Sequence, residues 1–573
     1  MDNLEVNPGN ISPVEKQALS DTYLAFLPKN TAGYTTKNQI IDVQIPRTEH
    51  VLRLNEAYFQ VELQTSFKAN IDYAPATGEV QYVGLLNSAT IFDQVYIKNN
   101  GKTIHTETFS QIQSRAWQLS KSTNYQIANP AAFLNYDDVS ANNGLLVHEL
   151  TSGAFKAGVE VPLKFRLKIP LSAVYQCFDN CDNFSTTLLN DDITLSMQLS
   201  HPNKYMCLIT ADSTSHKVKR VEPFGINAKI YDIIKPYMKS KITGWDETKD
   251  SIVFDTSFTT GTDNSNQVEW KTYTYSEAGT HGTDYVGTIT VYTIQVLDDD
   301  SKYYIDSLKM VVPGHYPTAD ESANYANLVA NGAVHYSFRD CDIKSQSTDF
   351  TNGTQHLNFS TNCENIFSVM MFASHAYSYV VFDKPYVDKI ECNLSEIYKL
   401  ANDKVHTEGT YDRDNDMYKN LIDGFGVDSF KNLQRFDKQI TKDFLQKEPK
   451  LAEWKDAGNL ICDRTSVQTG NYLQWYKVAP GNQMGISADY FANLINYKFE
   501  SKNDSTHDYA CNYSNSNIFC AQLRYRMLIY KEGGIDIVCP FAEELNMRSV
   551  ASDAPKSDAH GIGALVPMLL KPA

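Results

Sequence analysis

The chain has 573 residues, of which 42% are hydrophobic and 21% are charged, and its formal net charge is −17 at pH 7. This composition is that of a folded globular protein and excludes a disordered or membrane-embedded chain. The acidic balance argues against a protein that grips nucleic-acid phosphates through clustered lysines and arginines.

Length and aromatic content narrow the class further. A single hydrophobic core stops growing at roughly 250 to 300 residues, so a chain of this length predicts two domains. The 35 tyrosines and 27 phenylalanines favour pleated β structure and large protein contact surfaces. No stretch of about 18 apolar residues is present, so we expect no transmembrane segment.

The N-terminal part of the chain changes character near residue 39. Residues 1–38 are polar and show no sustained hydrophobic period, which predicts an arm that only a partner orders. Ile41, Val43 and Ile45 then alternate with polar residues up to Pro46. The stretch Ala57–Leu63 alternates in the same way, so both segments are predicted to be half-buried strands.

The stretch Ile91–Phe109 predicts a β-hairpin. Asn100-Gly101 lies between two β-rich runs, and a type I′ turn requires positive φ at both of its central residues. The tripeptide Gly101-Lys102-Thr103 is similar to the end of a phosphate-binding P-loop, but Tyr96 stands where that motif requires glycine. We therefore expect a hairpin here and no nucleotide site.

A helix is predicted directly after this hairpin. Ser110 is a suitable N-cap, and Ile112, Ala116 and Leu119 share one helical face.

The segment from Val161 to Leu199 has the clearest pattern in the chain. Apolar residues alternate with Lys164, Arg166 and Lys168 in the first part, and a second alternating run covers Ile193–Leu199. Between them, Pro170 suits the first position of a short helix. We predict strand, helix and strand, and the period of 2 favours an antiparallel sandwich with one face in water.

The polar stretch Thr210–Lys217 is predicted to separate two domains. After it, strands are expected at residues 224–234 and 251–258, followed by a hairpin over residues 288–312 that turns at Asp298–Ser301. From Tyr411 to Gly458 the pattern is helical. A strand at Phe519–Ile529 and a turn at Gly533-Gly534 then lead to a C-terminal tail.

The order of elements repeats along the chain. Ile91–Ile97 and Val381–Val387 share Phe, Asp and Tyr, and each is followed by a predicted helix start, Ser110 and Asn393. Ile193–Leu199 and Phe519–Ile529 also occupy corresponding places. These two pairs predict that the halves superpose, with the second half enlarged by the helical stretch.

No local signature of catalysis or metal binding is present in the sequence. Cys177 and Cys181 lack a second pair at zinc-finger spacing, so we expect structural thiols, and the ten cysteines form no disulfide framework. Asp412–Asp416 is similar to the start of a calcium loop, but Met417 stands at the glycine position and Asp423 at the glutamate position. His148-Glu149 and His375 are expected to be surface or core residues. We therefore predict no enzyme and no catalytic, cofactor-binding or metal residues.

The segment Lys168–Leu199, "KIPLSAVYQCFDNCDNFSTTLLNDDITLSMQL", resembles the end of the first jelly roll in the Polinton-related branch of double jelly-roll major capsid proteins. That group belongs to tailless double-stranded DNA viruses and includes the virophages and adenovirus hexon. The segment covers less than a tenth of the chain. The helical stretch at Tyr411–Gly458 departs from the group and leaves the subfamily open.

The resemblance implies an all-β fold of two tandem antiparallel jelly-roll sandwiches. The expected division is an N-terminal arm at 1–38, a first roll at 39–217, a second roll at 218–548 with a helical insertion at about 394–458, and a tail at 549–573.

The same resemblance implies a homotrimer that forms a pseudo-hexameric capsomer of an icosahedral shell. Its partners would be neighbouring capsomers, penton and minor capsid proteins, and DNA that is enclosed without sequence-specific binding. Such a protein is made in the host cytoplasm or nucleus and resides in the virion.

Two other classes remain open. A single-jelly-roll capsid or vertex protein fits the β content but not the tandem order. A glycan-binding β-sandwich would require an exposed tryptophan platform, or paired carboxylates if it cleaves glycans, and the five tryptophans are dispersed in the sequence.

Overall fold

The computed structural model describes most of the first 223 residues and selected segments beyond them. The described residues are 22–29, 33–35, 40–69, 78–121, 123–150, 156, 158–223, 272–278, 284–290, 294–297, 302–350, 353–360, 366–374, 382–383, 387–392, 410–412, 472–477, 494–501 and 513–538. Within them, all-β architecture dominates: the strands form several antiparallel sheets and the helices are few and short. The predicted fold class is confirmed.

One sheet of the first sandwich consists of two ladders that continue each other. The strands β3 (Ile40–Ile45), β12 (Ile193–Leu199), β7 (Phe92–Asn99) and β8 (Lys102–Glu107) form the first ladder, and β14 (Val218–Pro223), β13 (Met206–Asp212), β6 (Glu79–Leu85) and β9 (Val147–Leu150) form the second. Leu199 pairs with Phe92 at the end of one ladder, and Met206 pairs with Leu85 at the start of the other. Leu199 and Met206 are seven residues apart, and so are their partners Phe92 and Leu85. One register therefore runs through both ladders.

The opposite sheet of the first sandwich is built on three long strands. β10 (Glu160–Pro170) pairs with β5 (Tyr58–Ala69), which pairs on its other side with β18 (Tyr303–His315). Shorter strands extend this sheet: β1 (Thr22–Phe26) and β2 (Tyr34–Thr35) on β18, β4 (Val51–Leu52) on β18, β11 (Phe184–Ser185) on β4, and β17 (Ile294–Leu297) on β5. Phe165, Leu167 and Ile169 of β10 are buried, while Lys164 and Arg166 are exposed, as the alternation predicts.

The second sandwich has the strand order of a jelly roll. Its strands are β19 (His335–Phe350), β20 (Gly353–Ser360), β21 (Ile366–Ser374), β23 (Val387–Cys392), β24 (Thr410–Asp412), β25 (Tyr472–Lys477), β26 (Leu494–Ser501) and β27 (Tyr513–Lys531), with β22 (Phe382–Asp383) on β21 and β28 (Gly534–Val538) on β27. One sheet has the order β19, β27, β21, β25 and the other β20, β26, β23, β24. Apart from β23 and β24, which pair with each other, successive long strands thus alternate between two antiparallel sheets, which is the jelly-roll arrangement.

Helices connect these sheets and cover their ends. The described helices are α2 (Ser110–Ser120), α3 (Thr123–Ala128), α4 (Leu171–Val174) and α6 (Ala319–Ala330), with short turns of 3₁₀ helix at Leu54–Glu56, Ser88–Ile91, Val139–Asn142, Gln176–Phe178 and Pro202–Lys204. α6 starts in a capping box, because the Thr318 side chain accepts from the Glu321 N–H while Glu321 accepts from the Thr318 N–H. A hairpin of β15 (Thr272–Ala278) and β16 (Asp284–Thr290) is also present.

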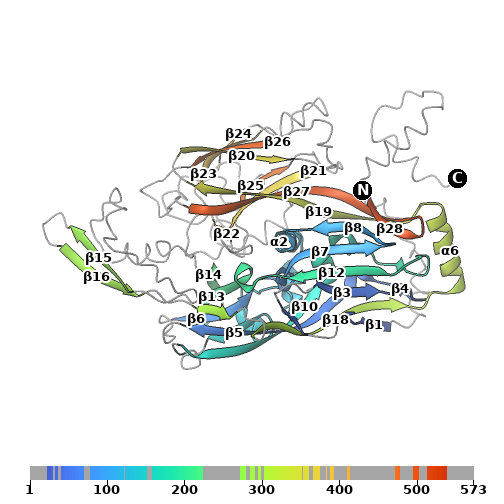
Figure 1. Cartoon of the computed structure of the whole chain (residues 1–573), viewed down its shortest axis with the longest axis horizontal. Coiled ribbons are helices and arrows are strands. Elements are labelled where there is room, and N and C mark those ends of the chain that lie inside the picture. The colour runs from blue at the N-terminus through green and yellow to red at the C-terminus, as the bar shows by residue number, and fades with distance from the viewer. Residues whose placement is uncertain are drawn as a thin grey trace.

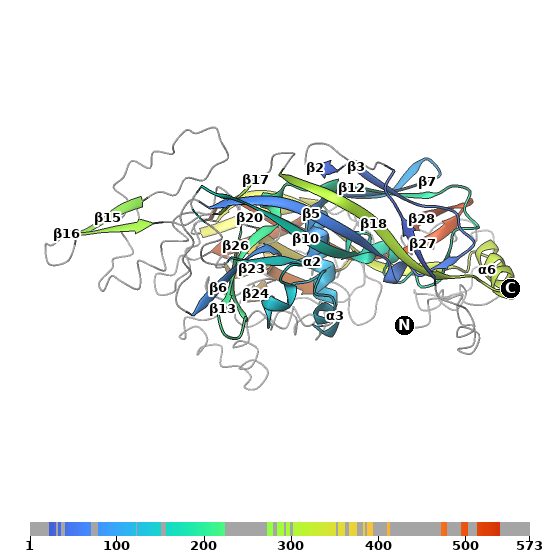
Figure 2. The ribbon, with the colours of Figure 1, turned by 90° about the horizontal axis from the view of Figure 1, so that it is seen from below.

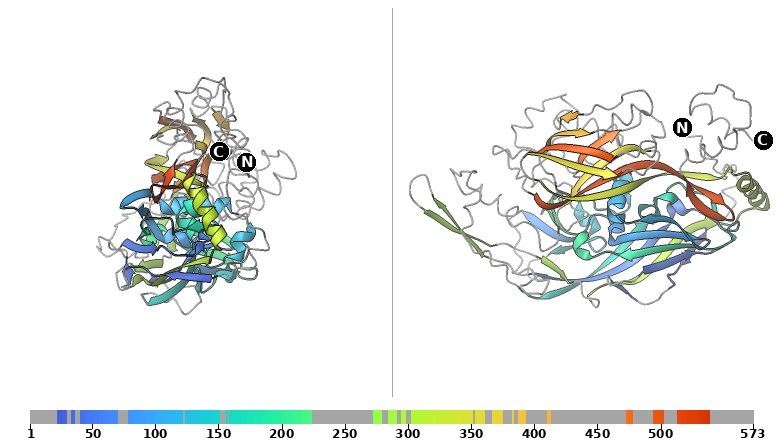
Figure 3. Two further views of the ribbon diagram at one scale, coloured as in Figure 1. Left: turned by 90° about the vertical axis from the view of Figure 1, so that its right-hand side faces the viewer. Right: turned by 45° about the horizontal axis from the view of Figure 1, so that its top comes forward.

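The four sheets are stacked as layers, with the β19–β27 sheet lying on the first sandwich (Figures 1 and 3). One hydrophobic core joins the first sandwich to the β19–β27 sheet: the cluster built on the first sandwich also contains buried residues of α6, β19, β27 and β28, among them Tyr325, Tyr336, Leu528, Ile535 and Ile537. The two halves therefore share a core at their contact.

Several local predictions are confirmed. Asn100 and Gly101 have φ of 50° and 70°, as a type I′ turn between β7 and β8 requires. The strand, helix and strand order over Val161–Leu199 is present, although Pro170 ends β10 and helix α4 begins one residue later.

Four expectations require correction. Residues 22–26 and 34–35 of the predicted arm are strands paired with β18 of the same chain. Thr210–Lys217 is no interdomain linker, because β13 and β14 pair on either side of its turn, so the predicted division at 217 and 218 falls within this hairpin. β17 and β18 both pair with β5, end to end, so among the described residues they do not form the expected hairpin. Ser110 is the first residue of α2, and Phe109 holds the cap position with its N–H donated to Glu107 Oε1 at 2.8 Å.

The predicted internal correspondence is half correct. β12 and β27 are equivalent, since β12 lies between β3 and β7 and β27 lies in the same way between β19 and β21. Ile91–Ile97 and Val381–Val387 are not equivalent, because β7 pairs with β12, whereas Phe382 and Asp383 form β22 on the far side of β21 and Val387 begins β23 in the opposite sheet. The position of β7 is taken in the second sandwich by β21. The shared Phe and Asp therefore occupy different strand positions in the two sandwiches.

Other predictions fall on residues that the structure does not describe. These are the strands at 224–234 and 251–258, the turn at Asp298–Ser301, His375, the helix start at Asn393 and the tail at 549–573. Of the helical stretch and the acidic run, only Tyr411 and Asp412 are described, and both belong to strand β24.

Candidate functional site

Among the described residues, no group of three or more His, Cys, Asp and Glu side chains is placed to hold a metal ion. Within the same part of the chain, no helix is long and apolar enough to cross a membrane. Buried polar side chains gather instead where β8, β11 and the hairpin of β7 and β8 contact α6, β19, β27 and β28. We call this contact the joint.

A buried ion cluster lies in the joint. The side chain of Asp340 on β19 is only 1% exposed and accepts from Arg524 on β27 at 2.7 and 3.2 Å. Arg526 approaches the same carboxylate at 3.6 Å and donates to the Ile537 carbonyl of β28 at 3.2 Å. Burial alone would raise the pKa of Asp340, but the two guanidinium groups outweigh burial and hold that pKa below its usual value. Asp340 is therefore an ionised carboxylate that links three strands.

Strand β8 contributes two buried titratable side chains next to this cluster. Burial raises the pKa of Glu107 to about 8, although the Phe109 N–H that it accepts acts in the opposite direction. Burial also lowers the pKa of His105 to about 4. At pH 7 the carboxyl group is thus largely protonated and the imidazole is neutral. Both side chains are less than 8% exposed, so the pair is buried in the joint.

Three tyrosines connect the second half to β11 of the first sandwich. Tyr325 of α6 lies between Tyr336 of β19 and Tyr530 of β27, with hydroxyl distances of 3.0 and 2.8 Å. Tyr530 donates to the Ser185 carbonyl at 2.8 Å and its ring stacks on Phe184 at 5.4 Å. Tyr336 donates to the carbonyl of Asn183.

Two β-turns interlock at the end of the joint. The side-chain carbonyl of Asn99 accepts from Ile535 N–H at 3.0 Å, while its amide donates to the carbonyls of Asp191 and Asp192. The Asn190 N–H donates to the Gly533 carbonyl at 2.6 Å. Gly534 lies against the Asn99 and Asn100 side chains so closely that a Cβ atom would overlap them. Glycine at 534 therefore serves close approach, while the turn itself is made by Glu532 and Gly533, whose φ angles are 51° and 74°.

The sequence did not predict the residues of the joint. Arg524 and Arg526 alternate with apolar residues, and that pattern indicates a face in water. The sheet of β27 is instead covered on both faces, so Gln522 is buried and Asp340 meets the arginines. No spacing within the sequence marks Asp340 as their partner, because the three residues meet only through strand pairing.

The residues considered in the sequence have structural surroundings. The thiol of Cys181 donates to the Cys177 carbonyl at 3.4 Å, and Cys177, Cys181, Cys207, Cys341 and Cys520 are buried and form no disulfide. Burial raises the pKa of the Cys177 thiol, so it is not a reactive thiolate. The His148 ring is half-buried, lies 2.9 Å from the Lys164 carbonyl through Nε2 and packs on Phe165. The arrangement of the joint suits mechanical connection of two sandwiches.

No protein-family model matches the chain, and no curated protein sequence matches it. Among solved structures, the mavirus major capsid protein is similar over 94% of this chain and 93% of its own, with 9% identity and a TM-score of 0.47. A chain of the Sputnik virophage structure is similar over 96% of this chain and 93% of its own, with 11% identity and a TM-score of 0.42. The Faustovirus major capsid protein is similar over 90% and 91%, with 9% identity and a TM-score of 0.41.

Proposed function

We propose that the chain is a viral major capsid protein that assembles as trimeric capsomers into an icosahedral shell around DNA. The observation that carries this proposal is the repeated strand order. In the first sandwich β12 lies between β3 and β7, and in the second β27 lies between β19 and β21. In the opposite sheets, β5 pairs with β10 and β20 pairs with β26.

Two similar sandwiches in one chain give a trimer six similar lobes. Identical chains usually close into cyclic symmetry, so one gene product could provide nearly hexagonal units for tiling a shell. The shared core and the buried ion cluster support such a building block, because they fix the two lobes relative to one another.

A structural role fits the polar groups of the joint better than catalysis does. Asp340 is paired with Arg524 and Arg526, and Glu107 accepts the Phe109 N–H, so these groups serve to hold strands together. The expected partners are other capsomers, penton and minor capsid proteins, and the expected location is the virion. DNA would be enclosed without being gripped, as the net charge of −17 suggests.

The test is particle formation by the full chain. Native mass spectrometry is expected to give a trimer, and negative-stain micrographs of the chain produced with its viral partners are expected to show closed shells. Because each chain is strongly acidic, assembly should improve as salt rises toward about 1 M, where the Debye length falls to ~3 Å. Light scattering across the salt series measures this.

A chain that remains monomeric at every salt concentration and yields no particles would contradict the proposal. A glycan-binding sandwich is the second candidate to test in that case, by glycan-array binding. A single-jelly-roll capsid protein is disfavoured by the second sandwich itself.

A further inference from the structure

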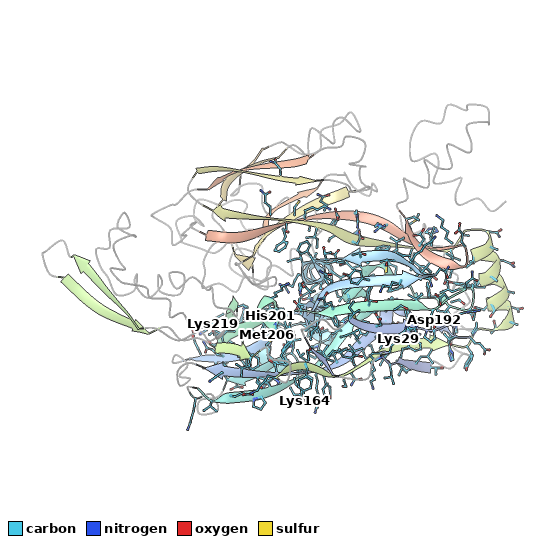
Figure 4. All side chains as sticks on the ribbon, viewed as in Figure 1. Lys29, Lys164, Asp192, His201, Met206 and Lys219 are labelled. Atoms are coloured by element: carbon cyan, nitrogen blue, oxygen red, sulfur yellow. The ribbon has the colours of Figure 1, made fainter. Side chains whose placement is uncertain are left out.

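The sheet of β10, β5 and β18 turns one face away from the rest of the molecule. Along β10, the residues that alternate with the buried Phe165 and Leu167 point outward, and their partners on β5 do the same in register, for example Arg166 opposite Glu62. This sheet is the lowest layer in Figure 1 and faces the viewer in Figure 2. Figure 4 shows Lys164 on this outer layer.

The charge of this face has the opposite sign to that of the chain. We call it the basic sheet face and define it by six cations and three anions: Lys68, Lys164, Arg166, Lys168, Lys302 and Lys309, with Glu62, Glu160 and Asp306. The whole chain has a net charge of −17. A solvated sheet face usually mixes charges of both signs, whereas here the cations are in twofold excess.

The three anions of the face form ion pairs with two of its six cations. Lys164 lies 2.7 Å from Glu62 and 3.3 Å from Asp306, and Lys302 pairs with Glu160. Lys168 lies over the Tyr58 ring at 4.5 Å. Arg166 and Lys309 are exposed, and no ion pair joins either to another described residue. These two side chains present positive charge that the face does not compensate.

Apolar side chains border the face on the β18 side. β1 extends the sheet there, with Tyr23 and Leu27 exposed by 69% and 66%. The eleven residues of β10 at ~3.3 Å each, and four strands at ~4.8 Å, give an area of roughly 700 Å². A standard protein interface buries about 800 Å² on each partner. The size, the aromatic border and the uncompensated charge thus suit a protein partner.

We propose that the basic sheet face binds the acidic surface of a second copy of this chain. The inference deepens the proposed function, since it assigns one contact between copies in the shell. Charge complementarity favours this occupant, because every other copy carries a large excess of carboxylates. A contact of this kind guides partners into register and speeds their association.

The test compares two double charge reversals in the full chain. Arg166→Glu/Lys309→Glu inverts the uncompensated charge of the basic sheet face. Lys98→Glu/Lys102→Glu is the matched control, because it changes the net charge equally at exposed lysines of the β7–β8 hairpin in the other sheet. We expect the first variant to weaken self-association at least about tenfold in sedimentation velocity, and the control to resemble wild type. The difference should shrink toward about 1 M salt.

Cross-linking identifies the contact directly. Zero-length carbodiimide coupling of mixed ¹⁴N- and ¹⁵N-labelled copies is expected to join Lys164, Lys168 or Lys309 of one copy to a carboxylate of another. Equal association of the two variants, with no such inter-copy link, would overturn the inference. If both variants still form shells, the capsid function stands without this contact. A wild-type chain that stays monomeric overturns both.

A nucleic-acid face would give a different result. A 30-base-pair DNA duplex should then bind wild type and the Lys98→Glu/Lys102→Glu control but not the Arg166→Glu/Lys309→Glu variant, while self-association is the same for all three. That outcome also overturns the proposed contact between copies.

Discussion

The second strand of each sandwich has different neighbours in the two halves. In the first sandwich, β5 lies between β10 and β18. In the second, β20 pairs with β26, and no other described strand pairs with it. An open sheet edge exposes unpaired backbone groups to other chains, and proteins usually cover or shorten such edges. The first sandwich covers the edge of β5 with a strand from the connection between the halves.

This difference shows that the two sandwiches are not independent units joined by a tether. β18 is part of the first sandwich, and α6 connects it to β19 of the second sandwich. Met310 and Val312 of β18 are buried in the shared core. We therefore expect the described parts of both halves to unfold together.

Breaking the joint should have the largest effect. Asp340→Ala leaves the half-buried Arg524 and Arg526 without their carboxylate and should lower the free energy of unfolding by about 3 kcal/mol. Urea unfolding measures it. Asp306→Ala removes a carboxylate that is 45% exposed and should change stability by less than about 1 kcal/mol. Equal losses in the two variants would mean that the joint contributes little.

Truncating β18 tests whether the connection belongs to the first sandwich. Met310→Ala creates a cavity at a fully buried site and should cost about 2 to 5 kcal/mol. Ser307→Ala on the exposed side of the same strand should stay within about 0.5 kcal/mol of wild type. If Met310→Ala produced a separate early transition and left the main one unchanged, β18 would be peripheral.

The joint should also weaken as pH rises above neutrality. Folded Glu107 keeps its proton up to a pKa of about 8, whereas the unfolded chain loses it near 4.5, so the stability this group contributes disappears as pH rises. His105 has the opposite dependence, because its folded pKa is about 4 against an ordinary 6.5.

The two effects oppose each other between about pH 4.5 and 6.5 and leave a plateau there. From pH 6.5 to 8 only Glu107 acts, and the free energy of unfolding should fall by about 2 kcal/mol. The charged groups around these side chains are Asp340, Asp342, Arg524 and Arg526. Unfolding of Glu107→Gln from pH 6 to 9 should lack the decline. An unchanged decline would place its source elsewhere.

The smallest effect concerns the two β-turns that meet at the joint. Asn100 and Glu532 both have positive φ, at 50° and 51°. Asparagine tolerates this region, but glutamate does not adopt it readily. Glu532→Asn should therefore raise the free energy of unfolding by about 0.5 kcal/mol and raise the melting temperature slightly. Asn100→Glu should lower stability by a similar amount, and differential scanning calorimetry can compare the two.

Local patterns predicted the strands but not their partners. The alternation in Val161–Leu199 and the Asn100-Gly101 turn each depend on neighbouring residues, and both are present in the structure. The alternation that includes Ile41 and Val43 was equally clear in the sequence, and both side chains are fully buried in the structure. Period and turn chemistry act within a few residues, which is why sequence alone was sufficient here.

Long-range pairing was where prediction failed. β18 pairs with β5 across more than 230 residues of sequence, and its alternation is also compatible with the predicted hairpin. The arginines of β27 look like solvent-facing residues until β19 places Asp340 beside them. The likeness of Ile91–Ile97 to Val381–Val387 was misleading because three shared residues do not specify a sheet.

The position of β18 has a consequence for synthesis. The ribosome makes β5 long before β18, so the edge of β5 must wait uncovered while more than 230 residues are added. The joint waits still longer, since β27 and β28 end only at Val538. Pairings of such separation form slowly and leave strand edges exposed during folding. Completion of the nascent chain therefore acts as a checkpoint, and a truncated polypeptide would be a target for chaperones before it could join any assembly.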